Sequence, residues 1–361
     1  MIIKKVYRKI RLWEQKIKLY FQLLFISFAG KKTTGLKIPD IKIWLKNFRK
    51  MALHFANTKY LFSFVKEFLE SDIQIEKKIG FKENSNLIAI CVIRNDIEKL
   101  KVFLEHHRKL GVNQFAFLDD KSADGTREFL LAQNDVELFK SSESFQTVRK
   151  TAWIDRILAY YGLNRWYLAL DSDELLVYDD FENKSIVNFV DSLQKENMSS
   201  ASGIMVDMYP KELNLNQTEK NNIYDGIDYF DKSGYFLTKY SMITGGMRYR
   251  CLGAEVFLEK TPLFFLDKET VYLTHDIFPL EKNFQKNKKS IALLHYKFLS
   301  EDIENYKDRI EKNAMAEGCR QYKIYMEKID SKNAVNFYDE NVSEKFTGAN
   351  SLIKHNLLEK I

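Results

Sequence analysis

Short apolar stretches alternate with helical repeats through the middle of the chain. Unbroken apolar runs predict strands at residues 87–93, 114–118, 136–139, 166–170 and 203–206. Apolar positions three and four apart predict helices between them, at residues 98–110, 126–133, 148–161 and 184–195. Strands that alternate with helices of this length are typical of a mostly parallel sheet covered by helices. The predicted fold class is therefore α/β.

The pattern differs on either side of this alternation. Residues 31–80 place apolar side chains at helical spacing, and helices are predicted again at residues 301–313 and 314–328. We therefore expect three parts, which are a helical N-terminal extension over residues 1–80, an α/β domain over residues 81–300 and a helical C-terminal extension over residues 301–361.

The net charge of +6 hides an uneven distribution. Residues 1–50 contain 14 Lys or Arg against two acidic residues, a balance of +12, which leaves −6 for the other 311 residues. From Ile2 to Leu24, apolar residues recur three and four apart, with basic residues on the other faces. Such a helix can bind an anionic membrane surface through residues 1–28, or it can pack on the domain with a solvated basic rim. No apolar run reaches the roughly 18 residues of a spanning helix, so membrane contact would be peripheral.

Cysteine use and the basic segment bear on location and partners. Cys91, Cys251 and Cys319 are odd in number and widely spaced. This argues against a disulfide framework and favours a reducing compartment. The expected location is the cytoplasm. Where residues 1–28 contact a membrane, this would be its inner face. Nothing after the basic segment resembles a base-reading module, so nucleic acid is not an expected partner.

Acidic residues follow the predicted strand at residues 166–170. Asp171, Asp173 and Glu174 come where the strand leaves the sheet, and open α/β sheets bind ligands at this edge. Two carboxylates at a strand end can hold a divalent cation that takes its other ligands from water and substrate phosphates. We therefore predict a metal and diphosphate site here. The alternative is a solvated acidic turn.

Four segments together resemble a known family. They are residues 91–96 (Cys-Val-Ile-Arg-Asn-Asp), 104–112 (Leu-Glu-His-His-Arg-Lys-Leu-Gly-Val), 118–126 (Leu-Asp-Asp-Lys-Ser-Ala-Asp-Gly-Thr) and 171–174 (Asp-Ser-Asp-Glu). In this order and spacing they resemble glycosyltransferases of the family 2-like kind, which have a GT-A fold. The resemblance covers about residues 85–300. It implies a Rossmann-like nucleotide-binding domain, a nucleotide-sugar donor, and Mg²⁺ or Mn²⁺ held by an Asp-x-Asp motif.

The resemblance also implies roles for the metal site. Asp171 would face the ribose or the metal, and Asp173 would bind the metal directly. His295 lies in the stretch at residues 292–298, where it closes a strand-like apolar run, and the bacterial branch with a late histidine uses it to complete the site. A lone histidine is otherwise more often structural. A mixed carboxylate and imidazole shell suits Mn²⁺ at least as well as Mg²⁺.

Nucleotide contacts are expected at two further strand ends. Asp119 and Asp120 begin the turn at residues 119–126, and the family's equivalent acid accepts hydrogen bonds from the base or ribose. Asp124 is expected to cap the following helix through Thr126 instead. Asn95 follows the first strand and is a candidate nucleotide contact, with a plain turn as the alternative.

The sequence also offers basic side chains for the diphosphate and acidic side chains for a catalytic base. Arg248, Arg250 and Lys260 follow the glycine pair at residues 245–246, and they can bind diphosphate oxygens or belong to a solvated loop. An inverting transfer, which the family likeness implies, needs a base beside the acceptor hydroxyl. Base candidates are Asp207, Glu255 and Asp276, with His275 as a further candidate for base or acceptor contact.

These features favour a metal-dependent glycosyltransferase of polysaccharide biosynthesis. It would move a sugar from a nucleotide-sugar donor to a surface glycan or lipid-linked acceptor. One alternative is a nucleotidyltransferase of similar fold, although residues 93–96 are not the glycine-rich basic loop expected there. The other is a non-catalytic scaffold or binding protein that keeps the fold, against which the intact Asp171 and Asp173 count.

Overall fold

The computed structural model describes most of the chain. The described residues are 13–22, 36–55, 57–80, 87–211, 222–239, 241–287, 289–299, 302, 306–307, 310–311, 319–331 and 336–361.

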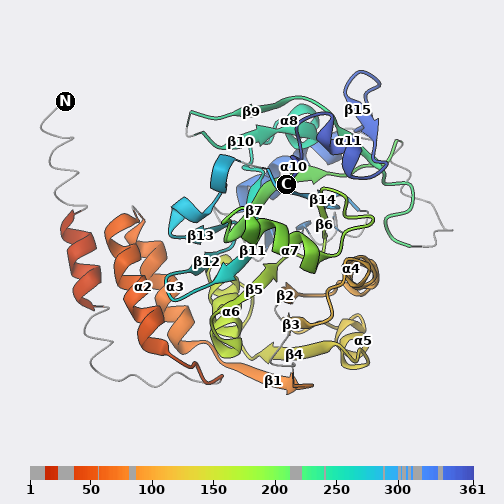
Figure 1. The fold of residues 1–361 in the computed structure, drawn as a ribbon. Coiled ribbons are helices and arrows are strands. Elements are labelled where there is room, and N and C mark those ends of the chain that lie inside the picture. Colours follow the sequence, from red (N-terminus) through yellow and green to blue (C-terminus); the bar gives the residue numbers. More distant parts are fainter. Residues whose placement is uncertain are drawn as a thin grey trace, which may run out of the picture.

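A mixed sheet forms the centre of the described structure (Figure 1). Its nine strands follow the order β1 (Ile73–Lys77), β4 (Val136–Ser141), β3 (Phe115–Asp119), β2 (Leu87–Ile93), β5 (Arg165–Ala169), β11 (Glu259–Leu266), β7 (Ser200–Asp207), β14 (Ile291–His295) and β6 (Glu174–Tyr178). Strands β1, β11 and β6 run opposite to the other six, as their antiparallel pairings show. The predicted α/β class with a mostly parallel sheet is confirmed, and the arrangement is consistent with a Rossmann-like GT-A fold.

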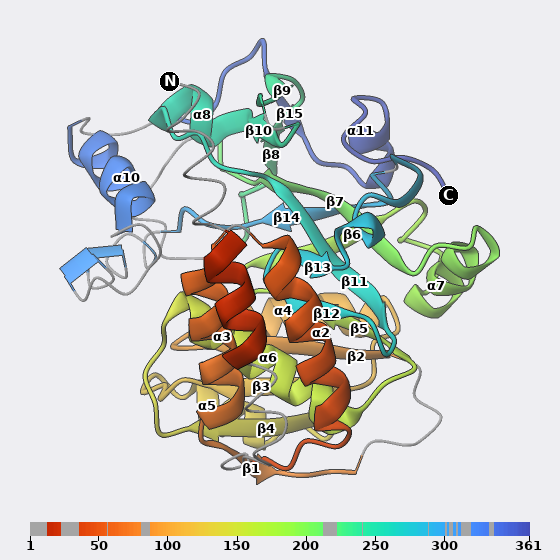
Figure 2. The ribbon, with the colours of Figure 1, turned by 90° about the vertical axis from the view of Figure 1, so that its left-hand side faces the viewer.

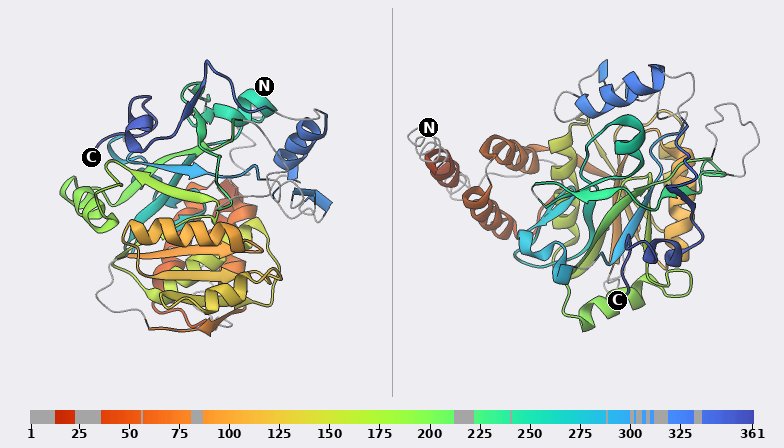
Figure 3. Two further views of the ribbon diagram at one scale, coloured as in Figure 1. Left: turned by 90° about the vertical axis from the view of Figure 1, so that its right-hand side faces the viewer. Right: turned by 90° about the horizontal axis from the view of Figure 1, so that it is seen from above.

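Both faces of this sheet are buried, which explains the unbroken apolar runs. Ile88 and Ile90 of β2 pack on one face, against α2 (Ile41–His54), α3 (Thr58–Glu70) and α6 (Thr147–Tyr161). The intervening Ala89 and Cys91 pack on the other face with α4 (Ile97–Lys109) and α7 (Ile186–Lys195). Figure 2 shows α2 and α3 in front of α6, and the left panel of Figure 3 shows α4 and α5 (Thr126–Leu131) on the opposite face. A strand covered on both sides has no polar face.

Smaller strand pairs lie around the sheet. The pairs β9 (Tyr235–Leu237) with β10 (Ile243–Gly245) and β8 (Tyr229–Asp231) with β15 (Ser343–Lys345) lie at one end of the molecule (Figure 2), whereas β12 (Val271–Leu273) with β13 (Asp276–Phe278) packs in the core that contains α6. Further helices are α8 (Gly246–Leu252), α10 (Arg320–Ser331) and α11 (Ala349–Ile353), with two 3₁₀ turns, η1 (Leu280–Lys282) and η2 (Gln285–Asn287). None of the helices within the described residues is both long and apolar enough to cross a bilayer.

The predicted elements between residues 87 and 207 are present, with boundaries shifted by at most three residues. Three strands of the central sheet were not predicted. One is β11, which pairs antiparallel with β5 and β7 in the middle of the sheet. β1 lies inside the segment predicted to be helical, and it extends the sheet by antiparallel pairing with β4. β6 directly follows the acidic turn and pairs with β14 at the other edge.

The two terminal parts are described only in part. Residues 13–22 are helical, whereas the rest of the predicted basic helix over residues 1–28 lies outside the described residues. Most of the helix predicted at residues 301–313 also lies outside them, and α10 falls within and just beyond the one predicted at residues 314–328. The division at residues 80 and 300 stays a prediction, although α2 and α3 share one core with α6 and the sheet.

Candidate active site

Most of the candidate residues lie at one end of the strands, along a single edge of the sheet. The strands of common direction end there, at Ile93, Asp119, Ala169, Asp207 and His295. The opposed strands β11 and β6 begin at the same edge, at Glu259 and Glu174. Ligands of open α/β sheets bind beyond this edge. The topology therefore brings together residues that are far apart in the sequence.

Asp173, His295 and Asp207 form a connected group at this edge. The parallel register of β14 and β7 sets His295 beside Asp207, and the His295 Nδ1 lies 2.7 Å from the Asp207 Oδ1. The other ring nitrogen, Nε2, lies 3.7 Å from the Asp173 Oδ2. An ionised Asp207 can only accept, so Nδ1 carries a proton toward it and Nε2 is the ring nitrogen that faces Asp173.

Arg248 keeps Asp207 ionised. Its Nε donates to the Asp207 Oδ2 at 2.7 Å, and both side chains are buried. Burial alone would raise the pKa of Asp207, but the Arg248 guanidinium and the His295 imidazole lower it below its usual value. Both carboxylate oxygens are thus occupied, which argues against Asp207 as the catalytic base and favours a role in orienting His295.

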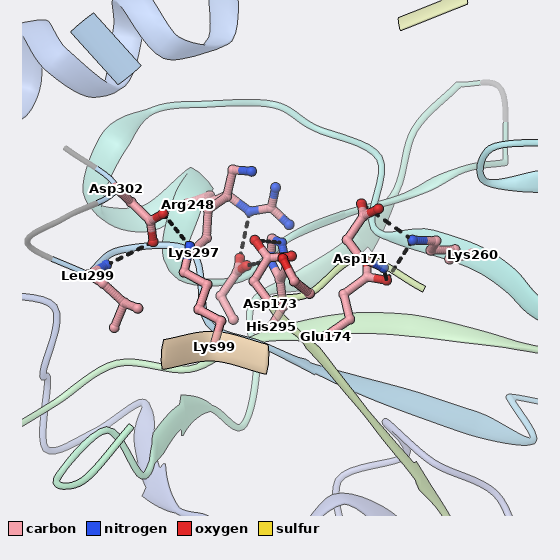
Figure 4. A network of polar contacts seen from close by, with 12 residues as sticks. Lys99, Asp171, Asp173, Glu174, Arg248, Lys260, His295, Lys297, Leu299 and Asp302 are labelled. Carbon is pink, nitrogen blue, oxygen red and sulfur yellow. Dashed lines mark hydrogen bonds and ion pairs between the residues drawn. The ribbon is translucent and has the colours of Figure 1, made fainter. Parts of the chain in front are cut away.

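Asp171 has different surroundings from Asp173. The Lys150 ammonium on α6 donates to Asp171 Oδ1, and Lys260 Nζ lies 3.6 Å from Oδ2. Lys260 also donates to the Glu174 Oε2 at 2.6 Å, so it bridges the two carboxylates (Figure 4). Burial opposes ionisation of Asp171, yet Lys150 and Lys260 hold its pKa well below the usual range. Burial raises the pKa of Glu174 despite the attraction of Lys260.

The two aspartates of the motif therefore do not converge on one point. Within the described residues, no group of three or more His, Cys, Asp or Glu side chains is placed to hold a metal ion. Asp173 and His295 fit the divalent cation that the resemblance implies, because they offer an oxygen and an oriented imidazole nitrogen 3.7 Å apart. Asp171 offers less, since two lysines already neutralise it.

The turn after β3 is held by its own side chains. Asp119 accepts from the backbone nitrogen of Ser122 at 3.2 Å, and Asn95 Oδ1 accepts from the nitrogen of Ala123 at 2.8 Å. The carboxylate of Asp124 accepts from the nitrogen of Thr126 at 3.0 Å, as the cap interpretation predicts. Asn95 and Asp119 thus shape the loop, and their nucleotide contacts stay predictions.

Asp120 is the exception in this turn. Its side chain is 1 % exposed, and neither carboxylate oxygen accepts a hydrogen bond of full geometry within the described residues, although Arg94 and the backbone of Phe145 are close enough to lower its pKa. The Nη1 of the half-exposed Arg94 forms an ion pair with its Oδ2 at 3.5 Å. Burial raises the pKa of Asp120, and Arg94 only partly offsets this. A buried carboxylate with so few partners is suited to accept from a ligand hydroxyl or amide.

The expected loop after the glycine pair is helix α8. Gly246 begins this helix, with Gly245 in a backbone conformation of positive φ before it. The Arg250 guanidinium is held by Asp231, at 2.6 Å and 2.9 Å, and by the carbonyl of Phe337. Both arginines therefore form ion pairs within the chain, Arg248 with Asp207 and Arg250 with Asp231. Because Arg248 is buried, the solvated-loop alternative is wrong for this residue.

The remaining base candidates lie in two places. Glu255 is exposed after α8. Asp276 begins β13, forms no ion pair within the described residues, and has its pKa raised by burial. The turn before it contacts the site, because the carbonyl of His275 accepts from the nitrogen of Thr261, next to Lys260. Burial, followed by the charge of Lys260, lowers the pKa of His275 to about 3, so its imidazole is neutral.

Lys150 carried no recognised sequence signal. It stands in the first turn of α6, 21 residues before Asp171, where a lysine is ordinarily solvated. Only the fold shows that its side chain contacts Asp171.

Comparison with known proteins gives distant similarities. No family model and no curated protein matches the sequence. A mannosyltransferase from Pyrobaculum calidifontis, solved with GDP-Man and Mn²⁺, is similar over 46% of this chain and 46% of its own length, at 14% identity and a TM-score of 0.27. A 4-diphosphocytidyl-2C-methyl-D-erythritol synthase from Anaerococcus prevotii is similar over 75% of this chain and 96% of its own, at 8% identity and a TM-score of 0.24. The chain thus matches less than half of the mannosyltransferase, and the function proposed below is inferred from the site.

Proposed function

We propose that this chain is a glycosyltransferase that moves a sugar from a nucleotide-sugar donor to a glycan or lipid-linked acceptor. The observation that carries the proposal is the Asp173 and His295 pair, 3.7 Å apart, with Asp207 behind the imidazole. A histidine whose Nδ1 is held by a carboxylate is prepared to bind a cation through Nε2. Its position at the ligand edge of the sheet suits a nucleotide diphosphate.

In this proposal Asp173 and His295 hold Mn²⁺ or Mg²⁺. When bound, the cation neutralises negative charge on the departing nucleoside diphosphate. Asp207 is a positioning residue, because it fixes the tautomer and the direction of the His295 ring. The charge of Arg248 keeps Asp207 ionised for this task.

Asp171 is proposed to bind the donor through hydrogen bonds. Its side chain is 33% exposed, and the two lysines keep it ionised. An ionised carboxylate accepts hydroxyl groups strongly, so Asp171 suits the ribose or the donor sugar. Asp120 is proposed to accept a second group of the nucleotide, since its buried oxygens accept no hydrogen bond of full geometry within the described residues.

Asp276 is the proposed base for an inverting transfer. Its pKa is raised by burial, which strengthens it as a proton acceptor near neutral pH. The proton of the acceptor hydroxyl would pass to Asp276 as the oxygen attacks the sugar carbon and the diphosphate leaves. We further propose a cytoplasmic location, since three widely spaced cysteines, an odd number, argue against a disulfide framework.

A donor screen tests the proposal. Purified protein is incubated with UDP-, GDP- and CDP-sugars and Mn²⁺, and release of nucleoside diphosphate is measured with and without acceptor glycans. We expect release from one donor class that is lost in Asp173→Asn and kept in Asp191→Asn, an exposed acid on α7. Release of pyrophosphate from a nucleoside triphosphate would instead indicate a nucleotidyltransferase. Donor binding without any turnover would indicate a binding protein.

A further inference from the structure

The helix over residues 13–22 has two unlike faces. Leu19 is buried against the core that contains α2 and α3, and the Lys16 ammonium donates to the carbonyl of Leu53 on α2 at 2.9 Å. The helix is therefore docked on the outer side of these helices, as Figures 1 and 3 show. On a helix, Leu19 lies about 200° around from Ile17. The side that faces away from the domain is thus a separate surface.

Apolar side chains occupy that outward side. Trp13, Ile17 and Phe21 are spaced by four residues, so they form one stripe, and they are 62%, 43% and 60% exposed. Such a row on a helix that already has a buried face is not needed for packing within the described structure. Exposed apolar rows of this kind mark contact with a partner.

The charge around the stripe identifies the partner. Lys18 and Glu14 lie beside it, Lys16 is held by the carbonyl of Leu53, and residues 1–50 as a whole carry a balance of +12. An apolar row within a segment of this net charge matches the two layers of an anionic bilayer surface. Tryptophan and phenylalanine insert at the headgroup boundary, while lysines meet the phosphates.

We propose that the face of Trp13, Ile17 and Phe21 docks this protein on an anionic lipid surface, with the helix lying parallel to the membrane. Leu19 and Lys16 then transmit the attachment to α2, so the whole α/β domain is held at the bilayer. This inference does not depend on the transferase activity, because it concerns a surface outside the candidate active site.

Trp13 offers a direct readout. All four tryptophans lie in the described part of the chain, and Trp44, Trp153 and Trp166 are buried. Addition of phosphatidylglycerol vesicles should shift the tryptophan emission to shorter wavelength, whereas phosphatidylcholine vesicles should not. Trp13→Phe should keep the binding measured by co-sedimentation and lose the spectral shift.

A triple variant tests the stripe itself. Trp13→Ser with Ile17→Ser and Phe21→Ser should lower the partition onto anionic vesicles by at least about 100-fold. A matched double variant, Val187→Ser with Leu280→Ser, removes exposed apolar side chains elsewhere and should bind as the wild type. Each basic residue near the surface should contribute about fivefold, so high salt should weaken binding strongly.

Three results would overturn the proposal. One is triple-variant binding equal to wild type, and another is equal binding to neutral and anionic vesicles. The third is a wild-type dimer in sedimentation velocity that the triple variant loses, without any vesicle binding, since a second copy would then cover the stripe. Circular dichroism and thermal unfolding confirm that the triple variant is folded, which its exposed positions predict.

Discussion

Asp171 and Asp173 are two residues apart and face opposite surroundings. Protein cations surround Asp171, with Lys150 and Lys260 in contact and Glu174 sharing Lys260. Asp173 faces the Nε2 of His295, whose Nδ1 donates a hydrogen bond to Asp207. One carboxylate is therefore in contact with two lysines. The other lies beside an imidazole, and Lys297 and Lys99 act on it from farther away to help lower its pKa.

This difference favours separate tasks for the two carboxylates of the Asp-x-Asp motif, which are cation binding and donor binding. A carboxylate that already has two ammonium partners gains less from a bound cation than one beside an imidazole. The Asp173 side is therefore suited to hold the cation, and the Asp171 side to keep an ionised acceptor for donor hydroxyl groups.

The two aspartates should respond differently to the same substitution. Asp173→Asn removes the charge beside His295, and we expect transfer to fall on the order of 1,000-fold with loss of Mn²⁺-dependent donor binding. Asp171→Asn removes one hydrogen-bond acceptor, so we expect roughly 10- to 100-fold less transfer with Mn²⁺ binding kept. Steady-state rates and Mn²⁺ titration by calorimetry measure both. Equal loss of Mn²⁺ binding in the two variants would contradict the division of tasks.

The lysine bridge on the Asp171 side should be a large stability element. Lys260→Met leaves the buried Glu174 without its cation, and we expect a loss of roughly 3–5 kcal/mol in the free energy of unfolding. Urea unfolding measures it. The control Lys286→Met breaks an exposed ion pair with Glu196 and should cost about 1 kcal/mol or less. Lys260→Met with Glu174→Gln should recover most of the loss, and a double variant as unstable as the single would refute the bridge.

On the Asp173 side, Asp207 should act through the imidazole. Asp207→Asn weakens the hold on His295, and we expect roughly 10- to 100-fold lower Mn²⁺ affinity. It also leaves the buried Arg248 without its anion, so stability should fall as well. Adding Arg248→Met should restore stability and leave the Mn²⁺ affinity low. Full recovery of affinity in that double variant would mean that Asp207 serves only the fold.

The backbone arrangement was largely predictable from the sequence. Strands buried on both faces, such as β2, are unbroken apolar runs, and the helices between them keep a spacing of three and four. β1 was missed because its five residues carry only Ile73 and Ile75 as apolar positions, which also fit a helix. Its strand form depends on the pairing with β4, which lies more than 60 residues away.

The site was predictable as a set of residues and not as a set of contacts. Asp173, His295 and Asp207 were all placed at strand ends, but the distance of 88 residues between His295 and Asp207 is closed by the register of β14 on β7. No local pattern specifies that register. The same holds for Lys150, because only the packing of α6 on the sheet turns a first-turn lysine toward Asp171.

Asp120 is a third carboxylate to set beside Asp171 and Asp173, and it has neither an imidazole nor a lysine bridge. We expect Asp120→Asn to weaken donor binding by about fivefold, because asparagine keeps one oxygen acceptor but loses the charge. Its effect on stability should have the opposite sign to that of Lys260→Met. Burial raises the pKa of Asp120, so ionising it in the folded protein costs stability that the amide does not.

The sign of that effect can be followed with pH. Below about pH 4, the usual value of an aspartate in the unfolded chain, Asp120 is protonated in both states and the variant should match the wild type. As the pH rises toward the raised folded pKa, the unfolded chain releases its proton first, and the wild type loses stability relative to Asp120→Asn. The gap should then stay constant at higher pH. Urea unfolding across this range measures it, and a variant less stable than wild type at neutral pH would show that Asp120 has a partner that stabilises its charge.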